Sequence, residues 1–285
     1  MTEESPALYV VATPLGNLGD LTARAADVLR AVQWVAAEDT RHSAPLLRHL
    51  GASARLLAAH EHNEEAAARQ VIDRLAAGES VALVSDAGTP AISDPGARLV
   101  ARVREAGYRI VPLPGACAAV AALSASGITA PHWLFYGFLP TKAKQRAEAL
   151  RELAALPMAL VFYEAPHRIV EAVDALAQAF GSERRLVIAR ELTKLFETIH
   201  ACPLGDAASW LAADANRQKG EFVLIVDTPE SSSGSGEGEV EAGRVLKLLL
   251  DDGLPVKQAA KLASAITGVA KNALYERALA LRDDK

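Results

Sequence analysis

Short apolar runs alternate with longer amphipathic segments over the first 126 residues. The apolar runs are rich in valine and alanine and are bounded by turn residues, which is typical of buried strands. They cover residues 8–12, 34–37, 81–84 and 108–112. Helical patterns follow at residues 22–32, 44–50, 64–77, 97–106 and 114–123, with Thr22 and Gly51 placed to cap two of these helices. This order of elements predicts a mostly parallel sheet with crossover helices.

The pattern changes after residues 127–131, where glycine and proline mark a boundary. Strand-like runs become more frequent and cover residues 133–138, 158–163, 185–190, 196–200 and 220–226. Helical segments separate them at 142–155, between 168 and 180, and near 205–213, and Thr141 stands at a capping position. Because strands now outnumber helices, the sequence predicts a second α/β domain with a mixed sheet.

Serine and glycine dominate residues 231–238, which predicts a flexible linker over 229–239. Two helical stretches, 240–250 and 256–281, follow it and resemble a helix-turn-helix with a turn at Thr267 and Gly268. This tail has eight basic and six acidic residues, so it either contacts nucleic acid or is a solvated helical face. The predicted division is an N-terminal α/β domain at 6–128, a second α/β domain at 129–228, the linker, and a helical tail at 240–285.

The overall composition narrows the class of protein. Thirty basic and thirty-five acidic residues give a net charge of −5, which is not the signature of a nucleic-acid coat. The cysteines, Cys117 and Cys202, are too few for a disulfide framework. No apolar run approaches the roughly 18 residues that span a bilayer. Residues 1–6 are acidic, so we expect no signal peptide there. We expect a soluble cytoplasmic protein with no membrane contact and no metal site, since His60 and His62 are too close in sequence to share a helix face.

Turn-rich loops follow several predicted strands, and ligands of open α/β sheets bind at the carboxyl ends of strands. The longest of these loops, Ser85–Gly96, contains glycine, proline, serine and aspartate. The first loop, Thr13–Asp20, contains glycine but matches neither the dinucleotide-binding pattern nor a P-loop. We therefore expect a small-molecule site at this end of the sheet, although the residues alone also fit ordinary turns.

Several strand-end motifs, taken together and in order, resemble the tetrapyrrole-methylase-like methyltransferases. The motifs are Thr13–Asn17, Glu38–Arg41, Ser85–Gly96, Pro114–Ala116, Phe138–Pro140, Tyr163–Arg168, Arg190–Lys194 and Lys219–Phe222. The resemblance covers residues 8 to about 227, and the helical tail matches in kind. It implies two α/β domains with an S-adenosylmethionine cleft between them, and a homodimer. Within the family, it favours the branch that methylates the ribose 2′-hydroxyl of a cytidine in the decoding region of 16S rRNA in the 30S subunit.

The same resemblance assigns a cofactor role to residues at several strand ends. The implied cofactor-binding residues are Pro14, Leu15, Gly16, Asp86, Gly88, Thr89, Cys117, Ala118, Tyr163, Glu164, Ala165 and Glu221. Some of these residues also fit a packing role. Cys117, for example, could be only a small buried side chain.

Contact with RNA phosphates is expected from basic residues near the same loops. The candidates are Arg41, Lys142, Lys144, Arg146, Arg168 and Lys194. The candidate catalytic residues for removing the hydroxyl proton are Glu164, His167 and Glu191. An ion pair between Glu164 and Arg168 would instead make that carboxylate structural.

Three alternative functions remain compatible with the residues. The fold could serve a nucleotide-dependent oxidoreductase, although the missing dinucleotide pattern argues against it. The same methyltransferase fold could act on a tetrapyrrole or another small molecule. The chain could also be an RNA-binding module without catalytic activity. Cofactor binding, together with the identity of the acceptor, separates these alternatives.

Overall fold

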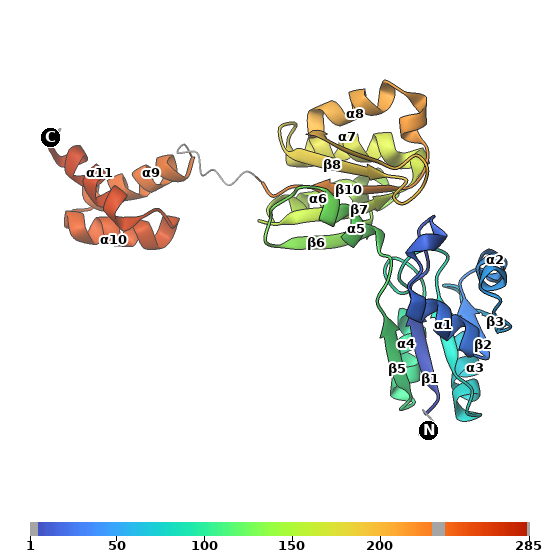
Figure 1. Cartoon of the computed structure of the whole chain (residues 1–285). Helices are drawn as coiled ribbons and strands as arrows, with labels where there is room; N and C mark the ends of the chain where they lie inside the picture. Colours follow the sequence, from blue (N-terminus) through green and yellow to red (C-terminus); the bar gives the residue numbers. More distant parts are fainter. Residues whose placement is uncertain (1–4, 230–236, 284–285) are drawn as a thin grey trace. The chain divides into compact units, whose positions relative to one another are not determined.

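The computed structural model describes residues 5–229 and 237–283. Its first sheet has five parallel strands in the order β3-β2-β4-β1-β5 (Figure 1). The strands are β1 (Ala7–Val11), β2 (Trp34–Ala37), β3 (Arg55–Ala58), β4 (Val81–Val84) and β5 (Arg109–Leu113). The prediction of a mostly parallel first sheet is confirmed, and the carboxyl ends of these strands meet at one edge.

Helices cover both faces of this sheet, because successive side chains of a buried strand point to opposite faces. Leu8 and Leu83 belong to the core on one face, and Val11 and Val35 belong to the core on the other. The first core is covered by α3 (Glu64–Ala76) and α4 (Ala97–Glu105), and the second by α1 (Ala23–Ala31) and α2 (Thr40–Leu50).

Capping explains where the local predictions succeed and fail. Thr22 accepts a hydrogen bond from the backbone N–H of Ala25 at 3.1 Å, and Gly51 ends α2 in the left-handed conformation, as predicted. Helix α2 begins at Thr40 rather than residue 44, because the Asp39 side chain accepts a hydrogen bond from the N–H of Arg41 at 2.8 Å. The prediction that Thr141 caps a helix is wrong, since α6 (Ala143–Ala154) has no side-chain cap.

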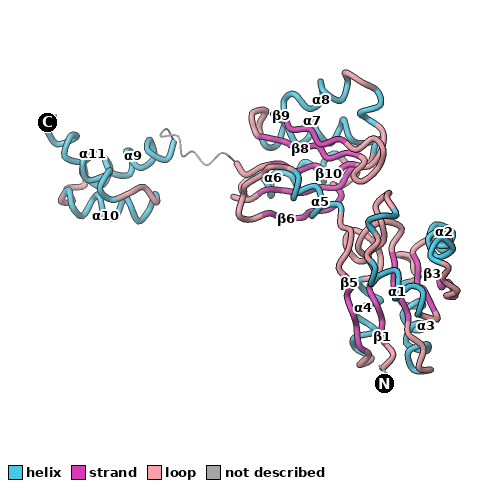
Figure 2. The backbone as a smooth tube through the Cα atoms, viewed as in Figure 1, coloured by secondary structure: helices cyan, strands magenta, loops and turns pink. Residues whose placement is uncertain are grey.

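The second sheet is mixed, as predicted, with the order β6-β7-β10-β8-β9. Strand β6 is parallel to β7, whereas β10 is antiparallel to β7 and β8, and β9 is antiparallel to β8. The strands are β6 (Trp133–Phe138), β7 (Ala159–Glu164), β8 (Arg185–Arg190), β9 (Thr198–Pro203) and β10 (Phe222–Val226). Figure 2 shows these strands among the helices that cover them.

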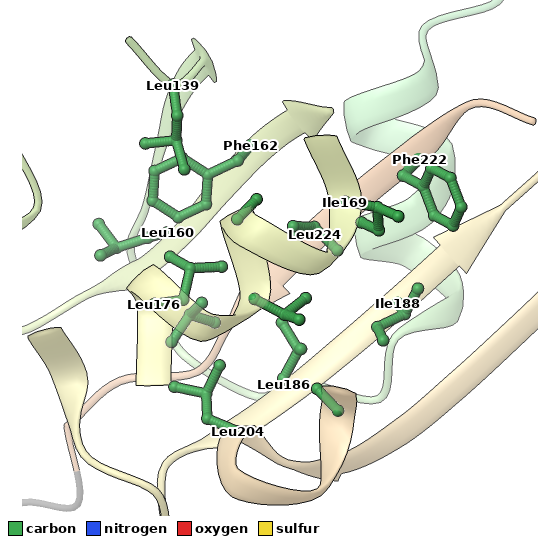
Figure 3. Packing of buried hydrophobic residues seen from close by; sticks show 14 of the residues in the cluster. Leu139, Leu160, Phe162, Ile169, Leu176, Leu186, Ile188, Leu204, Phe222 and Leu224 are labelled. Atoms are coloured by element: carbon green, nitrogen blue, oxygen red, sulfur yellow. The ribbon is translucent and has the colours of Figure 1, made fainter. Parts of the chain in front are cut away.

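One face of the second sheet carries the largest apolar core of the protein. Figure 3 shows Phe162 beside Leu160 and Leu139, with Leu176 and Leu204 below them. The helices on this face are α6, α7 (Ile169–Phe180) and α8 (Leu204–Ala212). Phe162 is fully buried, so this face serves stability and leaves the strand ends for other functions.

The opposite face of the second sheet is covered by α5 (Ala118–Ala125), although this helix follows the last strand of the first sheet. Its Ala119 and Ala122 pack with Val161, Val187 and Ile225. The small residues of α5 therefore permit close approach to a sheet. Residues 114–117 connect β5 of the first sheet to α5, which packs on the second sheet. The predicted domain boundary between residues 128 and 129 stays a prediction.

Residues 237–283 belong to a separate compact unit. Its helices are α9 (Glu237–Asp251), α10 (Val256–Thr267) and α11 (Lys271–Asp283). Leu246, Ala260 and Leu274 belong to their shared core, and Gly268 ends α10 in the left-handed conformation at the predicted turn. Most of the predicted linker, residues 230–236, lies outside the described residues. In the described part of the chain, no helix combines the length and apolar character that crossing a membrane requires.

Candidate active site

A cavity of about 400 Å³ lies between the strand ends of the two sheets. The first sheet contributes the loops after β2 and β4, and α5 contributes its first residues. The second sheet contributes the end of β7 and the start of β10. These five elements come from separate parts of the sequence, and the cavity is formed only when both sheets have folded.

Hydrogen bonds between loops fix the first wall. The backbones of Thr13 and Gly88 form a two-bond bridge, with N···O distances of 2.9 and 3.0 Å. The Thr89 hydroxyl donates to the carbonyl of Ala116 at 2.9 Å. Gly88 has a φ of +85°, and a Cβ there would lie 3.3 Å from Leu15. This wall is therefore preorganised, and glycine at position 88 lets the three loops approach one another.

Carboxylates gather on this wall. Asp86 accepts a hydrogen bond from the N–H of Asp39 at 3.2 Å, and Glu38 accepts one from the N–H of Asp86 at 3.4 Å. Burial and the neighbouring Glu38 raise the pKa of Asp94 to about 6. Burial also raises the pKa of Glu38. A wall with this concentration of carboxylates favours a cationic ligand.

The second sheet supplies an aromatic and a buried carboxylate. The Tyr163 hydroxyl accepts a hydrogen bond from the N–H of Ala119 at 3.0 Å, which ties β7 to the start of α5. Glu164 Oε1 lies 3.4 Å from Arg168 Nε and accepts the N–H of Ala165, whereas Oε2 is buried without a partner among the described residues. Glu164 lines the cavity, so a ligand can supply the missing donor.

Lys194 connects the two α/β parts of the chain at the edge of the cavity. Its Nζ donates to Glu191 Oε1 and to Glu221 Oε2, both at 2.9 Å. Its alkyl chain lies over Gly16 in the loop after β1, where a Cβ would come within 2.4 Å of Lys194 Cγ. The absence of a side chain at Gly16 is what allows Lys194 to occupy this position.

The structure brings the predicted cofactor residues together at this place. Ten of the twelve line the cavity, namely Leu15, Asp86, Gly88, Thr89, Cys117, Ala118, Tyr163, Glu164, Ala165 and Glu221. Pro14 and Gly16 line an adjoining cavity. Their binding role stays a prediction.

The predicted phosphate contacts divide into two groups. Lys142 and Lys144 are exposed, and Arg41 is exposed although it forms an ion pair with Asp39. The Arg146 side chain is buried against Glu171, which leaves little of it for a phosphate.

The other two candidates are already engaged. Arg168 donates to the carbonyls of Leu139 and Pro140 at 2.6 and 3.3 Å and pairs with Glu164, as the structural alternative anticipated. Lys194 is held by two glutamates. The geometry thus argues against a primary phosphate contact by Arg146 or Arg168.

The three predicted proton acceptors differ in their positions relative to the cavity. Glu164 lines the cavity, and its ion pair with Arg168 engages one of its two carboxylate oxygens. His167 is exposed in the short helix Pro166–Arg168 and does not line the cavity. Although burial acts in the opposite direction, hydrogen bonds from Lys194 and from the N–H of Glu221 lower the pKa of Glu191, which makes it a weaker base.

Sequence reasoning missed Asp94 and Glu38 as members of the site. Both lie inside motifs on which the family resemblance rests, Ser85–Gly96 and Glu38–Arg41. The available signal was the carboxylate at a strand end. Nothing in the sequence indicated that the loop after β4 would bring Asp94 to the cavity. In this loop the backbone adopts left-handed conformations at Ala91 and Ser93.

The two histidines weighed as metal ligands lie in a loop, with ring centroids 6.3 Å apart. Over residues 5–229 and 237–283, no group of three or more potential metal-ligating side chains gathers in one place.

Comparison with known proteins agrees with this architecture. The family model of the tetrapyrrole (corrin/porphyrin) methylases matches residues 7–208, and that of the RsmI C-terminal HTH domain matches residues 236–282. Ribosomal RNA small subunit methyltransferase I of Pseudomonas aeruginosa is 52% identical over 272 residues, which are 95% of this chain and 96% of that protein. The Escherichia coli O157:H7 protein of the same name is 50% identical over 272 residues, which are 95% of this chain and 94% of that protein.

Solved structures show the same fold. The methyltransferase CobJ matches 79% of this chain and 95% of its own chain, with a TM-score of 0.60 and 20% identity. Uroporphyrin-III C-methyltransferase from Thermus thermophilus has been solved in complex with S-adenosylhomocysteine. It matches 78% of this chain and 97% of its own chain, with a TM-score of 0.55 and 18% identity. The resemblance seen in the motifs is confirmed. The chain belongs to the tetrapyrrole (corrin/porphyrin) methylase family and, within it, to the group of ribosomal RNA small subunit methyltransferase I.

Proposed function

We propose that the protein transfers a methyl group from S-adenosylmethionine to the ribose 2′-oxygen of a cytidine in the decoding region of 16S rRNA. The observation that carries this proposal is the carboxylate-lined cavity between the two sheets. The names of the relatives support rRNA as the acceptor. The structure of the Thermus thermophilus relative with S-adenosylhomocysteine supports the cofactor.

The residues of the cavity fit such a cofactor. S-adenosylmethionine carries a sulfonium and an ammonium, and when bound it supplies an electrophilic methyl group. Asp86, Asp94 and Glu221 line the cavity and would provide negative charge for these cations. Apolar side chains, including Ile92 and Leu192, offer contact area for a flat base. The unpartnered Oε2 of Glu164 is a further acceptor for a hydroxyl or ammonium donor.

The protein also has to remove the proton of the acceptor hydroxyl as the new O–C bond forms. A carboxylate with a pKa near neutrality serves best, because it is ionised at working pH and still basic. Asp94, with its pKa raised to about 6, meets this requirement and lines the cavity. We propose Asp94 as the proton acceptor in place of Glu164, His167 and Glu191. Beyond proton removal, holding the methyl group and the 2′-oxygen close together supplies most of the rate enhancement of methyl transfer.

Contact with the ribosomal particle is assigned to exposed basic residues outside the cavity. Lys142 and Lys144 stand at the start of α6, directly after the loop that leaves β6. The helical tail, with its excess of two positive charges, is a second contact. Both would bind phosphate without reading sequence, so they strengthen binding while the cavity selects the nucleotide.

The resemblance also supports a homodimer working in the cytoplasm, where ribosomal subunits are modified. Strand β9 is an edge strand, and Leu195 and Phe196 are 90% and 66% exposed in the loop that precedes it. This edge is one surface on which a second copy could pair. Sedimentation equilibrium of the wild type and of Phe196→Asp tests this surface. If the two proteins have the same mass, the β9 edge is not the surface on which a second copy pairs.

The function is tested by methyl transfer from radiolabelled S-adenosylmethionine. The acceptors are 30S particles without decoding-region methylation, naked 16S rRNA, and a porphyrinogen as the control for small-molecule activity. Label mapped to a cytidine 2′-oxygen is the expected result. Label on the porphyrinogen alone, or on no acceptor despite tight cofactor binding, would refute the proposed acceptor.

A further inference from the structure

A second cavity of about 580 Å³ adjoins the first, and the proposed reaction does not yet use it. The two cavities share Leu15, Asp86, Ala87 and Glu221 in their linings. Its volume lies within the range of roughly 300–1,000 Å³ that is common for small-molecule sites. A molecule in the second cavity would meet one in the first across these shared residues.

One face of α2 forms a wall of the second cavity. Arg41, His42, Pro45, Leu46 and His49 all line it. Their spacing of three to four residues places them on one side of the helix over more than two turns. The side chains on this face are basic, imidazole or apolar, and none of them is acidic.

Arg41 retains free hydrogen-bonding capacity at this wall. Its Nε and Nη2 donate to the carboxylate of Asp39 at 3.1 and 2.7 Å, which uses two of the five N–H donors of a guanidinium. The Arg41 side chain is 90% exposed. Asp39 therefore orients Arg41 while its remaining donors face the solvent, which suits a phosphate oxygen.

The same cavity also has an apolar part. The loop after β1 contributes Pro14 and Leu18 to it, and Leu18 is 50% exposed. Together with Pro45 and Leu46, these side chains form an apolar surface suited to the face of a base. The shared part of the lining carries the carboxylates Asp86 and Glu221, which accept hydrogen bonds from hydroxyl groups. Phosphate, base and ribose hydroxyls thus each have a matching region.

We infer that the second cavity is the subsite for the acceptor nucleotide of the RNA, with its phosphate on the α2 face and its ribose toward the shared residues. The inference rests on the proposed function and adds the residues that hold the acceptor. His42 and His49 are positioning residues in this arrangement, because an imidazole N–H can donate to a phosphate oxygen and neither residue lines the first cavity. The exposed lysines at the start of α6 would then contact more distant parts of the same RNA.

The test compares two sets of substitutions on α2. His42→Ala combined with His49→Ala removes two groups from the cavity, and Arg48→Ala is the matched control, because Arg48 is exposed on the same helix and does not line the cavity. We expect the double variant to raise KM for the RNA acceptor about tenfold. The affinity for S-adenosylhomocysteine in calorimetry and the melting temperature should stay those of the wild type. Arg48→Ala should leave all three quantities unchanged.

The possible outcomes separate this inference from the proposed function. If the wild type methylates RNA and the double variant has an unchanged KM, the second cavity is not the acceptor subsite. A loss of cofactor affinity in the double variant would also overturn the inference, because it would assign the cavity to the cofactor. If the wild type methylates no RNA, the proposed function itself fails. Should the double variant unfold, His42→Gln with His49→Gln replaces it in the same comparison.

Discussion

Replacing Gly16 with alanine should destabilise the protein solely through Lys194. The backbone of Gly16 does not adopt a positive φ, so alanine fits the local conformation. The new Cβ, however, would lie 2.4 Å from Lys194 Cγ and 2.9 Å from Cε, where 3.4–4 Å is ordinary contact. The lysine must therefore move by about 1 Å or more. Its two hydrogen bonds of 2.9 Å, to Glu191 and Glu221, cannot both survive that movement.

Two opposing effects set the stability of Gly16→Ala: the loss of the Lys194 hydrogen bonds and the lower entropy of the unfolded chain when alanine replaces glycine. The Lys194–Glu191 pair is partly buried and the Glu221 side chain is 74% exposed, so losing both bonds costs about 1–2 kcal/mol. Replacing glycine with alanine at a compatible position stabilises by ~0.4–1 kcal/mol through the unfolded chain. Gly16→Ala should therefore lower the free energy of unfolding by about 1 kcal/mol in the wild type. In the Lys194→Ala background, the same substitution should raise it by ~0.4–1 kcal/mol.

Urea unfolding measures the free energy of interaction between positions 16 and 194. It is carried out on the wild type, on Gly16→Ala, on Lys194→Ala and on the double variant. The three tryptophans, Trp34, Trp133 and Trp210, all lie in the α/β part of the chain, so their fluorescence reports the part that contains the contact. The reversal of sign between the two backgrounds is the signature of a direct contact. Equal destabilisation by Gly16→Ala with and without Lys194 would refute the reasoning. It would mean that position 16 excludes a side chain for another reason.

Four further results are expected from the charges of the site and the surface. Burial and Glu38 raise the pKa of Asp94 to about 6. The protonated Asp94 carboxyl therefore adds to the free energy of unfolding fully below pH 4, and this contribution is lost as the pH rises through 6. Above pH 7, urea unfolding of cofactor-free Asp94→Asn should therefore show higher stability than the wild type. Binding of cationic S-adenosylmethionine, measured by calorimetry, should weaken as the pH falls from 7.5 to 5 in the wild type only, and a parallel loss in the variant would contradict the assignment. Replacing Lys142 and Lys144 with alanine should reduce the salt dependence of 30S binding by about two phosphate contacts, whereas a control at the exposed Arg151 of α6 should not change it. Removing residues 230–285 should weaken 30S binding and leave cofactor affinity intact, and equal 30S affinity would exclude the tail as a contact.

The architecture was predictable from the sequence wherever burial imposed a pattern. Runs such as Val81–Val84, all buried, give a strong signal for a central strand, and the structure has that strand at the same residues. Strand β3 gave no such signal, because only Leu57 of its four residues is buried. The packing of α5 was also hidden. Its residues are apolar on all sides, so the pattern does not indicate which of the two sheets it covers.

The members of the site were partly predictable, because several loops at strand ends carried recognisable motifs. What the sequence could not show is which charged side chains of these motifs are already engaged. Glu164 and Arg168 form an ion pair four residues apart, and Arg146 turns inward to Glu171 instead of outward with Lys142 and Lys144. These choices depend on contacts between elements far apart in the chain. A local pattern of basic residues cannot distinguish them.

The position of Lys194 shows how this fold connects its two sheets to one site. A single side chain from the second α/β part rests on a glycine of the first and bonds to Glu221 at the cavity wall. Because Glu221 lines both cavities, a movement of one sheet against the other would alter both proposed binding regions together. Transfer of a methyl group requires the two reacting atoms to be held in line at close range. The Lys194 contact is therefore expected to affect turnover more than it affects the binding of either reactant, and the kinetics of Gly16→Ala test that consequence directly.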